Sequence, residues 1–80
     1  MSPEEISRRI EAALPGAVVR VASDDDVHFA ALVVAPQFEG MRAIARHQLV
    51  YRALGGDVGG AIHALSLDTP TPAEWAARAG

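Results

Sequence analysis

Cysteine and lysine are both absent from this 80-residue chain, and each absence excludes a class of function. Without cysteine the protein can form no disulfide, and no metal site built only from its own thiolates. Its seven basic residues are all arginines, against ten acidic residues, which gives a net charge of −3. The broad basic surface typical of nucleic-acid-binding proteins is therefore missing, although a local basic face is compatible with this balance.

Large aromatic side chains and long hydrophobic runs are also scarce. Phe29, Phe38, Tyr51 and Trp75 are the only aromatic residues of this kind, so Val, Leu, Ile and Ala must fill most of the core. No apolar run approaches the ~20 residues needed to cross a bilayer, and no signal-peptide pattern is present. We therefore expect a cytoplasmic protein without membrane association, folded as a single small domain over residues 1–80.

Two segments carry strong helix-start signals. Residues 2–5 combine a capping serine, a proline at the first helical position and a glutamate that completes a capping box. Residues 71–74 repeat this device with threonine, and the short helix that follows has Trp75 as its expected anchor. The first helix should bury an apolar stripe composed of Ile6, Ile10, Ala13 and Leu14.

Two β-branched, apolar segments, residues 17–21 and 28–34, predict strands. The intervening residues 23–26, SDDD, predict a turn and hence an antiparallel hairpin. Three adjacent aspartates favour a solvated loop that discourages edge pairing. A carboxylate cation site is the alternative interpretation, but three consecutive side chains in a short turn converge poorly.

Residues 38–54 predict a turn followed by one long helix. On a wheel of about 100° per residue, Arg42 and Arg46 fall on the solvent-facing side, with Leu49 beside them. His47 falls in the middle of the apolar arc, which favours a packed histidine that shapes the fold. The two arginines form an ordinary solvated face, or they are contacts for a partner or for phosphate. The arc expected to face the core comprises Ala43, Ile44, His47, Val50, Tyr51 and Leu54.

Glycines mark both ends of this helix. Gly40 permits the bend that leads into it, and residues 55–60, GGDVGG, follow it. The second segment contains G-x-x-G, the loop that clamps a nucleic-acid backbone in KH domains. Asp57, however, would place a negative charge where phosphate sits, and glycines commonly end helices.

Residues 62–67 predict a third strand. Because the long helix connects the second and third strands, these strands should be parallel, with a right-handed crossover. A short helical turn around residues 57–58 is compatible with this element order but is not required by it. The simplest fold that buries every apolar stripe is α+β, a mixed three-stranded sheet packed against helices.

Three stretches, in this order and spacing, resemble the BolA family. The resemblance extends from the first helix through Trp75. It implies a fold similar to a class II KH domain, α-β-β-α-(α)-β-α, which agrees with the element order above. The stretches are Phe38-x-Gly40, Arg46-His47-x-x-Val50-Tyr51, and Ile62-His63-Ala64-Leu65 continuing to Thr71-Pro72-x-Glu74-Trp75.

The resemblance implies a non-enzymatic partner of monothiol glutaredoxins that shares a bridged 2Fe–2S cluster. The thiolates come from the glutaredoxin cysteine and from glutathione, so the cluster exists only in the complex. In this family the BolA protein supplies the histidine that corresponds to His63, and a second ligand is expected from the loop between the first two strands. His28 is the only candidate there, and its alternative interpretation is a strand-start residue beside Phe29. Neutral imidazole can replace thiolate on one iron, so a chain without cysteine suits shared ligation.

The resemblance also implies an alternative, a KH-like DNA-binding transcriptional regulator. The acidic balance and the absence of lysine predict only weak, salt-sensitive duplex binding. No Ser/His/Asp set or carboxylate pair indicates an enzyme. The free protein is expected to be a monomer or a weak homodimer.

Overall fold

The computed structural model of the chain describes residues 2–55 and 64–79. Its elements follow the predicted α+β order, and the optional helical turn at residues 57–58 lies outside the described residues. Within these two ranges, none of the helices has the length and apolar character needed to span a bilayer. The elements are α1 (Pro3–Ala13), β1 (Val18–Ala22), β2 (His28–Val34), the 3-10 helix η1 (Pro36–Phe38), α2 (Ala43–Leu54), β3 (Ala64–Asp68) and α3 (Pro72–Ala79).

The strands form one mixed sheet in the order β1-β2-β3. β1 and β2 are antiparallel, with Val18 opposite Val34, whereas β2 and β3 are parallel, with His28 opposite Ala64. Both pairings were predicted, and the parallel pair requires a crossover connection, to which α2 belongs. β1 lies one residue later than predicted, and the predicted strand residues 62–63 lie outside the described residues.

Side-chain caps begin α1 and α3, as predicted. Oγ of Ser2 accepts the backbone N–H of Glu5 at 3.2 Å. At α3 the capping box is reciprocal: the N–H of Glu74 donates to Oγ1 of Thr71 at 3.1 Å, and the N–H of Thr71 donates to Oε1 of Glu74 at 2.8 Å. The bend before α2 is confirmed at Gly40, whose φ of +76° favours glycine.

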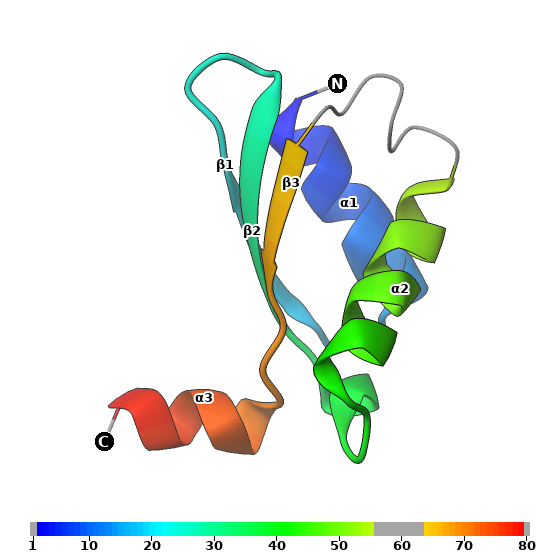
Figure 1. Cartoon of the computed structure of the whole chain (residues 1–80), viewed down its shortest axis with the longest axis vertical. Helices are drawn as coiled ribbons and strands as arrows, with labels where there is room; N and C mark the ends of the chain where they lie inside the picture. The colour runs from blue at the N-terminus through cyan, green and yellow to red at the C-terminus, as the bar shows by residue number, and fades with distance from the viewer. Residues whose placement is uncertain (1, 56–63, 80) are drawn as a thin grey trace.

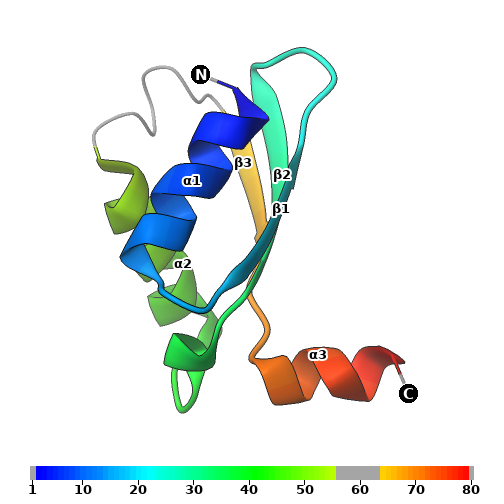
Figure 2. The same cartoon turned by 180° about the vertical axis from the view of Figure 1, so that it is seen from behind.

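The hydrophobic core lies between α1, α2 and one face of the sheet (Figures 1 and 2). Along β2, Phe29, Ala31 and Val33 face this core, so the alternate residues face the opposite side. Ala13, predicted in the stripe of α1, is exposed. The buried cluster consists of Ile6, Ile10, Leu14, Val19, Phe29, Ala31, Val33, Ala35, Phe38, Val50 and Leu54.

The buried face of α2 differs from the predicted arc. Val50 and Leu54 are buried as expected, but Ile44 is 68% exposed. Leu49, placed outside the arc by the wheel, packs against the core instead. The helix is therefore rotated so that Arg46 turns inward, and only 14% of its side chain is exposed.

α3 leaves the end of β3 toward the side of the sheet opposite α1 and α2 (Figures 1 and 2). None of its residues is buried. Trp75, the expected anchor of this helix, is 41% exposed. The Trp75 ring makes a cation–π contact with Arg78, whose guanidinium carbon lies 5.7 Å from the ring centroid.

Candidate functional site

The turn between β1 and β2 is built by its own side chains. Oδ1 of Asp25 accepts the backbone N–H groups of Val27 and His28, both at 2.9 Å. Oγ of Ser23 accepts the N–H of Asp26 at 2.9 Å and donates to the carbonyl of His28 at 2.6 Å. Asp26 adopts a φ of +58°, which aspartate tolerates better than most residues. The aspartates are thus turn residues, and among the described residues no group of three or more His, Cys, Asp or Glu could hold a metal ion.

His28 is oriented by Asp25. Nδ1 of the ring lies 2.8 Å from Oδ2 of the carboxylate, and the two side chains are 70% and 51% exposed. The hydrogen bond from the His28 ring, followed by the N–H groups of His28 and Val27, holds the pKa of Asp25 well below its ordinary value. An ionised carboxylate at this distance requires a proton on Nδ1, so a neutral ring carries its lone pair on Nε2. In this tautomer, the imidazole can ligate a metal through Nε2.

His28 also lies beside the start of β3. Its register partner is Ala64, the residue that follows His63 in the sequence. His63 itself lies outside the described residues, as does the G-x-x-G pattern at residues 56–59. Of the two predicted ligands, the described part of the chain therefore contains His28, at the exposed start of β2.

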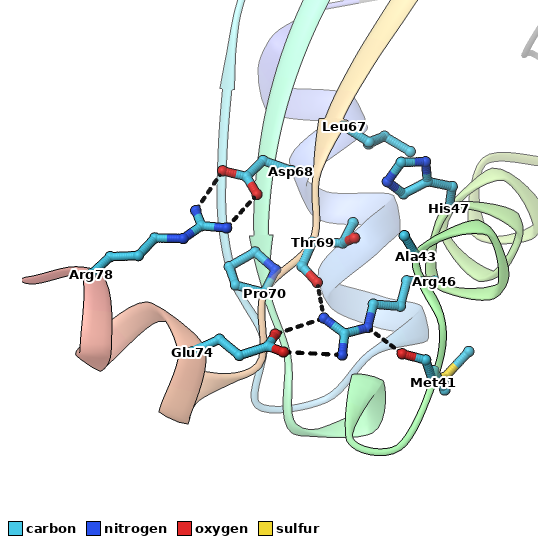
Figure 3. A pocket seen from close by; sticks show the side chains of 10 residues that line it. All are labelled: Met41, Ala43, Arg46, His47, Leu67, Asp68, Thr69, Pro70, Glu74 and Arg78. Carbon is cyan, nitrogen blue, oxygen red and sulfur yellow. Dashed lines mark hydrogen bonds and ion pairs between the residues drawn. The ribbon is translucent and has the colours of Figure 1, made fainter.

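Arg46 joins three segments of the chain (Figure 3). Nε donates to the carbonyl of Met41 at 2.9 Å, and Nη1 donates to the carbonyl of Thr69 at 2.8 Å. Nη1 also lies 2.7 Å from Oε1 of Glu74, and the guanidinium carbon lies 5.9 Å from the centroid of Phe38. The prediction that Arg46 presents its guanidinium to solvent is therefore wrong, because its donors are engaged within the fold.

Two ion pairs connect α3 to α2 and to the end of β3. The pKa of Glu74 is lowered to about 2, first by the hydrogen bond from Arg46 and then by the hydrogen bond from the N–H of Thr71. Arg78 lies 2.7 Å from Asp68, which lowers the pKa of Asp68 and raises that of Arg78. Since these carboxylates are exposed and screened by water, the pairs orient α3 more than they stabilise the fold.

The other two predicted residues of α2, Arg42 and His47, lie in different environments. Arg42 is exposed at the N-cap of α2, where its side chain makes no capping hydrogen bond, so it is still a candidate contact for a partner or for phosphate. His47 is half-buried. With Leu67 and Asp68 it lines a hollow of about 470 Å³ (Figure 3).

A family model described as BolA-like protein matches residues 7–74. The chain belongs to the BolA family. BolA-like protein 1 of Mus musculus is 40% identical to it over 75 residues, which are 94% of this chain and 52% of that protein. The structure of a BolA protein homologue from Coxiella burnetii superposes with a TM-score of 0.82 at 45% identity, covering 95% of this chain and 97% of that one. The family resemblance and the α+β fold are thus confirmed.

A bacterial BolA relative bears a functional name. The DNA-binding transcriptional regulator BolA of Vibrio cholerae is 40% identical over 55 residues, which are 69% of this chain and 52% of that protein. The chain spans about half the length of these two curated relatives. Neither of their names nor the family description refers to a catalytic activity.

Two features of this BolA-family chain were missed in the sequence. An aspartate three residues before His28, inside a predicted turn, is a local signal that could have indicated the Asp25–His28 pair. The bond between Arg46 and Glu74 spans 28 residues. No local pattern predicts such a contact.

Proposed function

We propose that this BolA-family chain is a non-enzymatic, cytoplasmic partner of a monothiol glutaredoxin, with which it shares a bridged 2Fe–2S cluster. The role would be iron–sulfur cluster trafficking, or iron and redox sensing. His28 and His63 are the proposed ligands from this chain. The thiolates come from the glutaredoxin cysteine and from glutathione, so the cluster forms only in the complex.

The observation that carries the proposal is the orientation of His28 by Asp25. Ligating histidines generally donate their second ring N–H to a carboxylate or carbonyl, which fixes the tautomer and raises ligand basicity. His28 has this partner at 2.8 Å, and its ring is 70% exposed, so a second protein can reach it. The pairing of His28 with Ala64, the neighbour of His63 in the sequence, supports ligation of one cluster by both histidines.

The donor set fits a shared cluster. Iron–sulfur clusters are anchored mainly by cysteine thiolates, and this chain has none. Imidazole can replace thiolate, and when bound the cluster supplies a redox centre whose potential histidine ligation raises. The residues of this chain then have two tasks: Asp25 holds the proton on Nδ1, and His28 offers Nε2 toward the partner.

Visible circular dichroism of purified complexes tests the proposal. Wild type, His63→Ala and His28→Ala are each mixed with the same cluster-loaded monothiol glutaredoxin, and His47→Ala serves as the matched control. We expect both ligand variants to lose the spectrum of the heterocomplex or return it to that of the glutaredoxin alone. We expect His47→Ala to keep it. Identical spectra for wild type and a folded His63→Ala protein would contradict the proposal.

The second candidate function is DNA-binding transcriptional regulation, which the name of the Vibrio cholerae relative favours. Against it stand the net charge of −3 and the engagement of Arg46 inside the fold. A salt titration on duplex DNA separates the two candidates. We expect weak binding that collapses between low and physiological salt; tight, sequence-selective binding at physiological salt would favour the regulator.

A further inference from the structure

The sheet face that points away from α1 and α2 carries a row of small side chains. In the strand register, Ala22 lies opposite Ala30, and Ala30 lies opposite Ser66. All three residues are exposed. α1 and α2 both lie on the other side of the sheet (Figures 1 and 2). Because these side chains are short, the backbone of a partner protein can approach this face of the sheet closely.

Two adjoining hollows extend along this face. One, of about 300 Å³, lies between His28 and Ala22 and includes Asp24. The other, also of about 300 Å³, is lined by Arg20, Leu32 and Asp68, among others. Both are lined by Ala30 and Ser66. We call the two hollows together the sheet trough; it runs from His28 to Arg20.

Of the charged side chains that line the sheet trough, Asp68 and Arg20 differ in their partners. Asp68 is paired with Arg78 at 2.7 Å. Arg20, which lies opposite Leu32 in the register, makes only a 3.4 Å contact with the carbonyl of Val19. Among the residues that the structure describes, Arg20 forms no ion pair. The far end of the trough therefore offers a positive charge that a carboxylate can neutralise.

We propose that the sheet trough is the docking surface for the cluster-carrying glutaredoxin, and that Arg20 pairs with a carboxylate on that partner. This inference rests on the proposed function. A metal–nitrogen bond is about 2 Å long, so a protein that shares a metal with His28 must lie over this end of the sheet. The trough continues from His28 across Ala30 and Ser66, which gives the partner a contiguous contact area beside the metal.

Affinity measurements on surface variants test this inference. Ala30→Tyr fills the trough with a residue that suits a strand, and Ala12→Tyr adds the same bulk on α1, which packs on the other side of the sheet. Arg20→Glu reverses the charge in the trough, and Arg8→Glu makes the same change on α1. Each variant is checked for folding by thermal unfolding and titrated into a cluster-loaded monothiol glutaredoxin encoded in the same genome.

We expect Ala30→Tyr to weaken binding by about tenfold or more, as for the loss of an interface centre. Arg20→Glu should weaken it by about three- to tenfold, and less at high salt. Both α1 variants should change affinity less than about twofold. If wild type binds and shows the heterocomplex spectrum but Ala30→Tyr binds equally well, the docking surface is wrong and the proposed function stands. If wild type does not bind, both fail.

Discussion

Nδ1 of His28 lies 2.8 Å from Oδ2 of Asp25, in a turn where the other oxygen of the same carboxylate accepts two backbone N–H groups. One aspartate thus closes the turn and orients the ring. Because all of these contacts come from within the chain, the imidazole is positioned before any partner arrives. Preorganisation of this kind lowers the entropic cost of forming a shared site.

Asp25→Asn tests this coupling. The amide oxygen can still close the turn, but the amide N–H would donate to Nδ1 and favour the tautomer with its proton on Nε2. We expect an intact fold and about 10- to 100-fold weaker retention of the cluster in the complex, the usual effect of losing such a carboxylate. Competition with a chelator measures retention, and NMR of the ring nitrogens reports the tautomer. Asp24→Asn is the control; equal retention in both variants would show that Asp25 does not act through His28.

Arg46→Ala should destabilise the domain while Arg42→Ala does not. Arg46 donates to two carbonyls and one carboxylate from a side chain that is 14% exposed, and charged hydrogen bonds contribute about 1.5–3 kcal/mol each. We expect a loss of about 2 kcal/mol for Arg46→Ala and less than about 0.5 kcal/mol for the exposed Arg42. Urea unfolding measures both. Equal midpoints would place the two arginines in equivalent environments.

Val50→Asp and Ile44→Asp test the rotation of α2. Val50 is fully buried, so an aspartate there costs several kcal/mol, comparable to the whole stability of a small domain. Ile44 is 68% exposed in the first turn of α2, where a negative charge interacts favourably with the helix dipole. We expect Val50→Asp to be unfolded and Ile44→Asp to melt close to wild type. Unfolding of both variants would instead support the orientation of α2 predicted from the helical wheel, in which Ile44 faces the core.

Acid should weaken the attachment of α3. Glu74 has an ordinary pKa of 4.5, which Arg46 and the N–H of Thr71 lower to about 2 in the fold. A lowered folded-state pKa stabilises the protein above the ordinary value, and that contribution is lost as pH falls from about 4.5 toward 2. Thermal unfolding of wild type and Glu74→Gln across this range measures the effect. The difference between the two proteins should shrink as pH falls, and a constant difference would exclude the linkage.

The features that were predicted correctly depend on short local motifs or on general rules for connecting strands. The Ser2 cap of α1, the capping box of α3 and the hairpin turn at residues 23–26 follow from short motifs. The parallel pairing of β2 with β3 follows from connection rules. The family and its fold followed from motif order. These features needed no knowledge of long-range contacts.

The failures have long-range causes. The wheel treats Arg46 as solvent-facing, but acceptors from Thr69 and Glu74, 23 and 28 residues away, take its donors inside the fold. Ile44 is apolar and was counted toward the core, yet it is 68% exposed. Trp75, the expected anchor of α3, is 41% exposed, and ion pairs of Glu74 and Arg78 connect this helix to α2 and β3.

Pulsed electron paramagnetic resonance of the reduced cluster tests the central claim most directly. The histidine rings of this chain are labelled with the nitrogen-15 isotope, and the labelled chain is combined with unlabelled, cluster-loaded glutaredoxin. Ligation by His28 and His63 predicts a strong ring-nitrogen coupling to the cluster spin that changes with the label and weakens in His63→Ala and in His28→Ala. A heterocomplex that retains its cluster but whose spectrum is the same with labelled and unlabelled chain would contradict the account, because no imidazole of this chain would then be bound to iron.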